Sequence, residues 1–192
     1  MADELSIVDL DEAAGRMRPT TIPDSTPDIA LVRLHLDRPV KATVSLVAFP
    51  AGWSRPGPGH FSCAEEFVVI EGDLTVSGVG YGPGDYAYLP VNMPRTASRT
   101  EYGCLSVAWF SGAPRWHSGA GGDGSATPVR APLAGARRPG GGAYGSARAP
   151  SGPVAVDTDV LWLGARRWCF LPAGTAVPRV AGGPVLVREW PR

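Results

Sequence analysis

Hydrophobic and polar positions alternate with a period of two in several short stretches of the chain. In DIALVRLHLD (28–37), apolar residues fill every second position, and charged residues and His35 fall between them. The runs KATVSLVAFP (41–50), EEFVVIEG (65–72), YAYLP (86–90) and GCLSVAWF (103–110) also fit strands, and DLTVSGVGYG (73–82) fits a hairpin. Glycine or proline corners separate these runs. The pattern predicts an all-β barrel or sandwich.

The ends of the chain follow a different pattern. Residues 1–27 are an acidic lead in which the spacing of Asp9 and Glu12 predicts a short capped helix. Residues 113–153 are rich in Gly, Ala, Ser, Pro and Arg, which predicts a linker, although a lid over the barrel mouth is the alternative. Residues 154–192 again have a sequence pattern typical of strands. The predicted segments are therefore 1–27, 28–112, 113–153 and 154–192.

Two of the corners carry a resemblance to the cupin superfamily. The first lies in AGWSRPGPGHFSCAEEFVVIEG and the second in GPGDYAYLPVNMPR. Gly52, His60, Glu65 and Gly72 stand at positions of the first cupin motif, and Gly84, Pro90 and Arg95 at positions of the second. The resemblance implies a cupin-type double-stranded β-helix (jelly-roll) barrel over residues 28–112. The segment LPAGTAVP is similar to FPAGWSRP of the first motif. In this respect the chain resembles a bicupin with a truncated second repeat, which would add strands to the barrel.

The metal site implied by this resemblance is altered. Cupins hold a divalent metal with three histidines and one glutamate, but here Pro58 and Arg95 occupy two of the histidine positions. A guanidinium about 4 Å from a dication would cost about 8 kcal/mol at an effective dielectric constant of about 20. We therefore expect no metal and no other cofactor. A metal site recruiting His35 or His117 is the alternative.

Without a metal, His60, Glu65 and Arg95 suit acid/base chemistry. An imidazole titrates near neutral pH, a carboxylate can orient it or take a proton itself, and a guanidinium binds a carboxylate, enolate or phosphate. We add Tyr86 or Tyr88 as a proton donor, since the strand phase does not say which of them points inward. The alternative is a buried Glu65–Arg95 ion pair that merely replaced the metal.

Aromatic side chains would line an apolar cavity around these groups. Trp53, Phe67 and Trp109, together with Arg95, are the expected substrate-binding residues, although barrels of this size also use such side chains as core. The expected ligand is a small organic, polyketide-like molecule.

Charge and cysteine content narrow the class of protein. The 192 residues carry 18 basic and 18 acidic side chains, so electrostatics favours neither nucleic acid nor an anionic membrane as a partner. Three cysteines at no metal or disulfide spacing, and an N-terminus without a signal-peptide pattern, predict a cytoplasmic protein. The single lysine, Lys41, among arginines suggests a GC-rich bacterial genome. Homodimerisation is expected only because it is common among cupins.

The sequence therefore favours a metal-independent cupin enzyme that performs cyclisation, isomerisation or elimination on a small substrate, in bacterial specialised metabolism. Two alternatives stay open: a metal-dependent cupin dioxygenase or lyase, and a non-catalytic cupin that binds a small molecule. A third histidine in the barrel would favour the first alternative, an open cavity that reaches both His60 and Arg95 would favour the acid/base enzyme, and a filled barrel would favour an inert protein.

Overall fold

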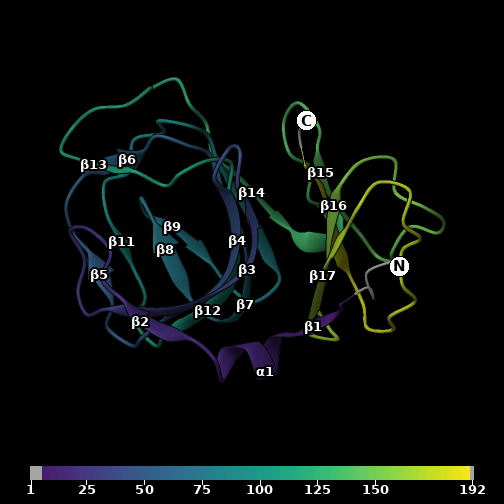
Figure 1. Ribbon diagram of the computed structural model, residues 1–192. Coiled ribbons are helices and arrows are strands. Elements are labelled where there is room, and N and C mark those ends of the chain that lie inside the picture. The colour runs from purple at the N-terminus through teal and green to yellow at the C-terminus, as the bar shows by residue number, and fades with distance from the viewer. Residues whose placement is uncertain (1–5, 191–192) are drawn as a thin grey trace. The chain divides into compact units, whose positions relative to one another are not determined.

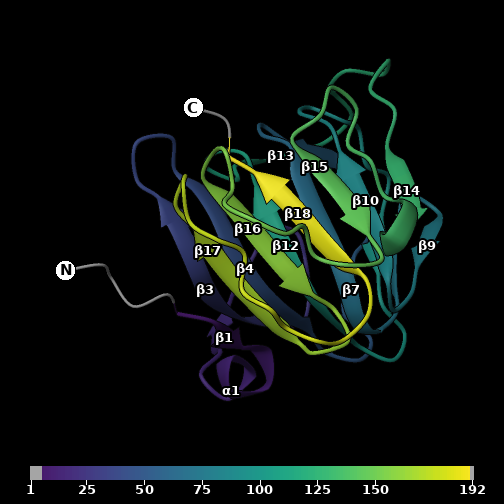
Figure 2. The same ribbon diagram turned by 90° about the vertical axis from the view of Figure 1, so that its right-hand side faces the viewer.

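The structure is a computed structural model that describes residues 6–190, and it is built almost wholly from β-strands (Figures 1 and 2). Its contacts divide the chain into two compact units. Residues 16–130 form the larger unit, and the N-terminal segment together with the chain from residue 131 onward forms the smaller one. No helix among the described residues is long and apolar enough to cross a membrane.

The larger unit is built on a seven-stranded sheet. Its spatial order is β14 (Val129–Pro132), β10 (Asp85–Leu89), β7 (Glu65–Gly72), β12 (Cys104–Phe110), β4 (Ala42–Phe49), β3 (Ile29–Asp37) and β2 (Arg18–Thr20). The pairings from β10 through β2 are all antiparallel. Strands distant in the sequence are thus neighbours, as in a jelly roll.

Shorter strands complete this unit. They form a four-stranded sheet in the order β5 (Ser54–Arg55), β11 (Ser98–Arg99), β8 (Leu74–Val76) and β9 (Val79–Tyr81), and a two-stranded sheet of β13 (Trp116–Ser118) and β6 (Gly59–Phe61). Figure 1 looks into the resulting barrel, with these short strands facing the large sheet.

The predicted alternation in β7 is confirmed. Phe67 and Val69 belong to a buried apolar cluster with residues of β4, β8, β10 and β12. Glu66, on the opposite face, accepts a hydrogen bond of 2.6 Å from the hydroxyl of Tyr86. Glu65 therefore shares the barrel-facing side of the strand with Phe67.

The predicted corners are present at both motifs. Gly52 and Gly84 have φ angles of +76° and +84°, a region that favours glycine. At the first corner, the Trp53 amide donates to the Pro50 carbonyl at 3.0 Å. The corner turns the chain sharply between β4 and β5, and so brings Trp53 and Arg55 back to the barrel.

The smaller unit has a five-stranded sheet and its own core. The sheet order is β1 (Val8–Asp9), β17 (Arg167–Leu171), β16 (Thr158–Trp162), β18 (Val185–Glu189) and β15 (Ala143–Ser146). A 3-10 helix, η1 (Leu133–Gly135), precedes β15. The apolar cluster of this unit comprises Val160, Trp162, Cys169, Leu171, Val185 and Val187.

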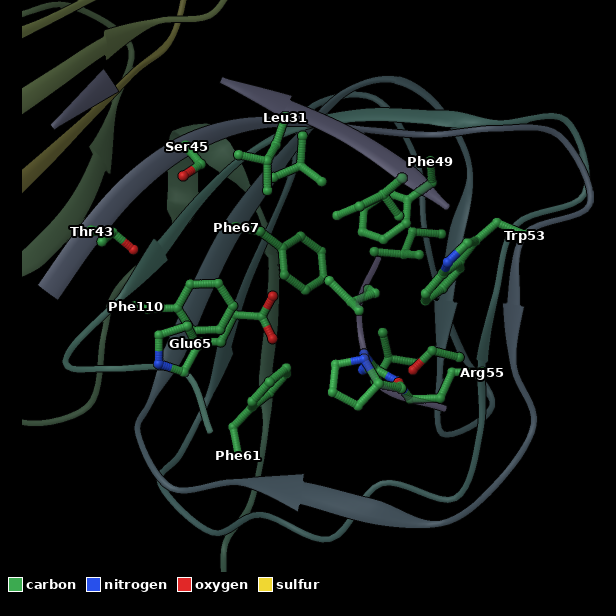
Figure 3. A pocket seen from close by; sticks show the side chains of 18 of the residues that line it. Leu31, Thr43, Ser45, Phe49, Trp53, Arg55, Phe61, Glu65, Phe67 and Phe110 are labelled. Atoms are coloured by element: carbon green, nitrogen blue, oxygen red, sulfur yellow. The ribbon is translucent and has the colours of Figure 1, made fainter. Parts of the chain in front are cut away.

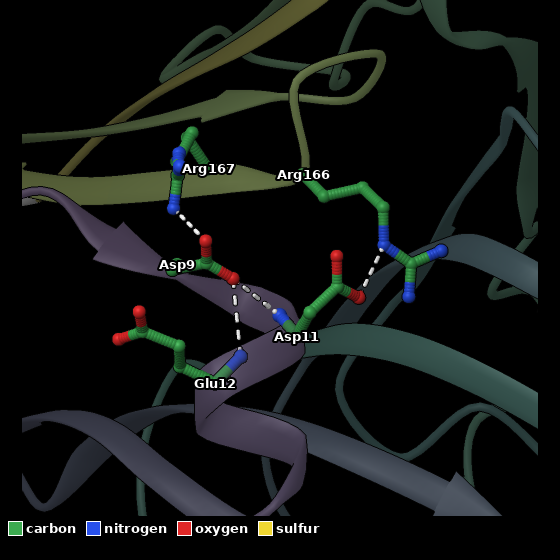
Figure 4. A network of polar contacts seen from close by, with 5 residues as sticks. All are labelled: Asp9, Asp11, Glu12, Arg166 and Arg167. Carbon is green, nitrogen blue, oxygen red and sulfur yellow. Dashed lines mark hydrogen bonds and ion pairs between the residues drawn. The ribbon is translucent and has the colours of Figure 1, made fainter.

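The predicted N-terminal helix is confirmed as α1 (Leu10–Ala14). Asp9 caps it by accepting hydrogen bonds from the amides of Asp11 at 2.8 Å and Glu12 at 3.1 Å. The Asp9 carboxylate also pairs with Arg167, and Asp11 pairs with Arg166 at 2.8 Å (Figure 4). These contacts tie α1 to the sheet of the smaller unit.

Residues 113–153, predicted as a linker or lid, contain β13, β14, η1 and β15 in this structure. Further along, the corner after β17 repeats the geometry of the first corner. The Thr175 amide donates to the Pro172 carbonyl at 3.0 Å, and Gly174 has a φ of +85°. The truncated second repeat itself stays a prediction.

Candidate functional site

A cavity of about 220 Å³ lies inside the barrel of the larger unit. Aromatic side chains supply much of its wall, and Figure 3 shows them converging from different strands: Phe49, Trp53, Phe61, Phe67 and Phe110. The barrel is therefore open enough inside to hold a small molecule, and Trp53 and Phe67 are among the residues that line it.

Glu65 and Arg95 meet within this cavity. Nη1 of Arg95 donates a hydrogen bond of 2.6 Å to Oε2 of Glu65, and the two side chains are 5% and 14% exposed, respectively. Glu65 comes from the start of β7, and Arg95 from the segment that bridges to Gly59 at the start of β6. The structure thus contains the buried Glu65–Arg95 ion pair that the sequence offered as the alternative to an acid/base set with His60, and in it each charge neutralises the other.

A second buried guanidinium lines the same cavity. Arg55 in β5 is 3% exposed, and its Nε donates to the Pro23 carbonyl at 3.0 Å. Burial is the main cause that lowers its pKa to about 10, and the positive charge of Arg95 lowers the pKa further, while Glu65 acts in the opposite direction. Arg55 therefore stays protonated at neutral pH.

Sequence reasoning missed Arg55, although a signal existed. Arg55 lies two positions after Trp53, so a strand leaving the first corner would place both side chains on one face. Trp53 was predicted to line the cavity, and the same face brings Arg55 into it. Phe110 was missed in the same way: it pairs with Glu65 across β12 and β7, which directs it to the cavity side.

Three buried donors at the cavity lack a partner among the described residues. They are Nη2 of Arg55, Nε of Arg95 and Nε1 of Trp53. A buried N–H without an acceptor is costly, so such groups call for an explanation. The unpartnered groups at the cavity are therefore N–H donors, and Glu65 is the one charged acceptor among the described lining residues.

His60 lies outside the set of residues that line the cavity. It precedes Phe61 in β6, and because Phe61 points into the cavity, alternation turns His60 to the other side. Its ring stacks on His117 of β13, with the centroids 5.0 Å apart and the planes at 15°. The structure thus separates His60 from Glu65 and Arg95, with which the sequence grouped it.

Tyr86, Tyr88 and Trp109 also lie outside the cavity lining. Tyr88 and Trp109 both pair directly with Glu66, and directly paired residues share one face of a sheet. Tyr86 bonds to that same glutamate. The three aromatic residues therefore occupy the face of the sheet opposite Glu65. The sequence left open which tyrosine points into the barrel, and in the structure both point away from it.

A short strap consisting of β13 covers Arg55. The Trp116 ring lies 4.1 Å from Cζ of Arg55, and Phe61 contacts the same guanidinium at 5.6 Å. Asp24 fixes the strap by accepting hydrogen bonds from Nε1 of Trp116 at 2.8 Å and from the Ser118 hydroxyl. Trp116 of the strap and Phe61 of β6 thus hold the plane of Arg55 between two aromatic rings.

The metal that the cupin-type fold implies does not fit these residues. Glu65 is bound to a cationic side chain, Arg95 stands at a ligand position, and His60 faces away from the cavity. Within residues 6–190, no group of three His, Cys, Asp or Glu side chains could hold a metal ion. The donor set is therefore one of guanidinium and indole N–H groups, which bind anions rather than cations.

Comparison with solved structures shows similarity over almost the whole chain. A proposed dioxygenase from Nostoc punctiforme has a TM-score of 0.77 at 14% identity, covering 98% of this chain and 83% of that one. Protein Ylba from E. coli has a TM-score of 0.60 at 12% identity, with 95% and 89% covered. A proposed glyoxylate-induced protein from Pseudomonas aeruginosa has a TM-score of 0.54 at 13% identity, with 98% and 92% covered.

Neither a family model nor a curated protein sequence matches the chain. At these identities the structural similarity concerns the fold alone. It confirms the predicted all-β, cupin-type jelly-roll fold.

Proposed function

We propose that the larger unit is a metal-independent enzyme that performs acid/base chemistry on a small organic substrate. The observation that supports this most directly is the Glu65 carboxylate, held by Arg95 inside an otherwise largely apolar cavity. Glu65 is the single carboxylate among the lining residues described, and His60 lies elsewhere. We therefore assign the role of base to Glu65.

The chemistry that fits this site is proton transfer next to a carbonyl group. The bond with Arg95 uses Oε2 of Glu65, so Oε1 is the oxygen that would take the proton. The substrate C–H bond breaks, its proton moves to Oε1, and its electron pair places a negative charge on the carbonyl oxygen. A guanidinium N–H stabilises that enolate. Return of the proton to the same carbon gives exchange or epimerisation, and its return to a carbon conjugated with the enolate gives an isomerisation.

A direct test is hydrogen–deuterium exchange at carbon. Phenylpyruvate and phenylacetone are similar in size, and each carries acidic C–H groups beside a carbonyl. We expect the protein in D₂O to accelerate the loss of these proton signals in one or both compounds by NMR, and Glu65→Gln to reduce the acceleration by at least about a hundredfold.

Glu71→Gln is the matched control, because Glu71 lies on the same strand but is exposed. It should exchange protons at the wild-type rate. Full activity in Glu65→Gln would remove Glu65 from the mechanism. Binding of these compounds without any exchange would instead favour a non-catalytic small-molecule-binding protein.

A metal-dependent dioxygenase is the second candidate, because the Nostoc punctiforme structure of that proposed activity shares the fold over 98% of this chain. It requires ligands from outside the two motifs. Exchange activity that survives prolonged treatment with a chelator would argue against it.

A further inference from the structure

The cavity holds more buried positive charge than its carboxylate can neutralise. Arg55 and Arg95 are both at least 95% buried, whereas Glu65 supplies one negative charge. We propose that the substrate is a small monocarboxylate with a flat apolar body, and that Arg55 anchors its carboxylate group. This inference rests on the proposed function, since it names the substrate class for the same cavity.

The unpartnered donors support an anion with several acceptor sites. Arg55 offers Nη2, and Arg95 and Trp53 offer Nε and Nε1. A carboxylate presents two oxygens with about four lone-pair directions, so it can accept from two or three donors at once, whereas a lone carbonyl accepts fewer. Arg95 and Arg55 also lie over the same ring, since their Cζ atoms are 4.7 and 5.6 Å from the Phe61 centroid.

Arg55 is built as a fixed anchor. Its Nε is committed to the Pro23 carbonyl, and Trp116 and Phe61 hold its plane. Asp24 also attracts this guanidinium, but less strongly than Glu65, and the Oδ2 of Asp24 already accepts from Trp116 and Ser118. A guanidinium fixed in this way loses little freedom when it binds a planar carboxylate.

Size and lining define the rest of the ligand. A volume of about 220 Å³ is below the roughly 300–1,000 Å³ of pockets for drug-sized ligands. Phe49, Phe67 and Phe110 offer aromatic faces to a flat apolar body. Arg33 also lines the cavity, but its side chain is exposed, so the buried charges leave a net excess of one positive charge, which favours a monoanion over a phosphate dianion.

The test compares matched acids and amides by titration calorimetry. Phenylacetate and 3-phenylpropionate are measured against phenylacetamide and 3-phenylpropanamide, which keep the shape but lack the charge. We expect the wild-type protein to bind at least one acid about tenfold or more tightly than its amide. Arg55→Gln should remove this preference, and Arg55→Lys should restore part of it.

Arg99→Gln is the control variant. Arg99 is exposed on β11, the strand that pairs with β5, so the change removes one positive charge close to the site without touching the cavity. It should keep the wild-type preference for the acid. The wild-type comparison requires no variant, so a folding defect in Arg55→Gln would not prevent the test.

Failures of the two proposals can be told apart. Equal binding of acid and amide, binding of neither acid, or a preference that survives in Arg55→Gln would overturn the carboxylate assignment. Proton exchange of neutral phenylacetone that depends on Glu65 would still support the enzyme. Arg55-dependent binding of the acids without proton exchange would support the carboxylate site and overturn the proposed chemistry.

Discussion

Nη1 of Arg95 donates a hydrogen bond of 2.6 Å to Oε2 of Glu65, inside the cavity of the larger unit. Removing one partner would leave the other as an uncompensated buried charge. We expect Glu65→Ala to lower the free energy of unfolding by about 3–5 kcal/mol, and the double variant Glu65→Leu, Arg95→Met to recover most of that loss. Urea unfolding measures both. Strictly additive effects of the single changes Glu65→Leu and Arg95→Met in the double variant would contradict a coupled pair.

The same pair predicts a low metal content. A dication near Arg95 would be repelled, and His60, the motif histidine that remains, faces away from the cavity. Protein purified without chelator should therefore hold well below one equivalent of Fe, Mn, Ni or Zn. Elemental analysis of wild type and His60→Ala makes the comparison. Stoichiometric metal that disappears in the variant would contradict the metal-free mechanism.

Gly59 of β6 packs directly against the strap. A Cβ added there would lie 2.3 Å from Cζ2 of Trp116 and 2.6 Å from the His117 carbonyl oxygen. Gly59→Ala should therefore displace β13, lower stability by about 1–3 kcal/mol and increase amide exchange at residues 116–118. Gly57→Ala, whose Cβ meets nothing within 4 Å, should leave that exchange unchanged.

Asp24 gives the strap a pH dependence at acid pH. Hydrogen bonds from Ser118, and to a smaller extent from Trp116, lower the pKa of Asp24 below its ordinary 3.8. A carboxyl whose pKa is lowered by folding contributes its full stabilisation when the pH is above its pKa in the unfolded chain. That stabilisation is lost as the pH falls through its pKa in the folded protein. The Trp116 indole N–H resonance should hence stay constant from pH 7 to about pH 5 and shift only in stronger acid.

Asp24→Asn provides the control for that titration. The amide can still accept a hydrogen bond from Trp116 but has no charge to lose over this range. The acid shift of the indole resonance should vanish in this variant. A shift that persists would assign the titration to another group.

Much of the fold could be predicted because its signals are local. Alternation in EEFVVIEG placed Glu65 and Phe67 on one face, and glycines with positive φ mark the corners that the sequence indicated. The contact between Glu65 and Arg95 was expected only as an alternative, because the resemblance to cupins places both residues at metal-ligand positions.

The remainder of the site depends on strand phase, which local patterns do not determine. Tyr86 and Tyr88 share a face, but whether that face is inward depends on their register with Glu66. His60 and Phe61 could exchange sides with a one-residue change in the path of β6. Arg55 lies within the first motif stretch but at none of the matched motif positions, and its burial beside Glu65 and Arg95 appears only in the folded chain.

Asp24 joins segments that are remote along the chain, since Trp116 and Ser118 lie 92 and 94 positions away. Contacts that close such long loops form late in folding, because they carry the largest loop-closure entropy. We therefore expect the strands of the barrel to pair first, and the hydrogen bonds between the strap and Asp24 to form last. The position of the Trp116 ring over Arg55 is therefore set only after the two ends of this 92-residue span have met.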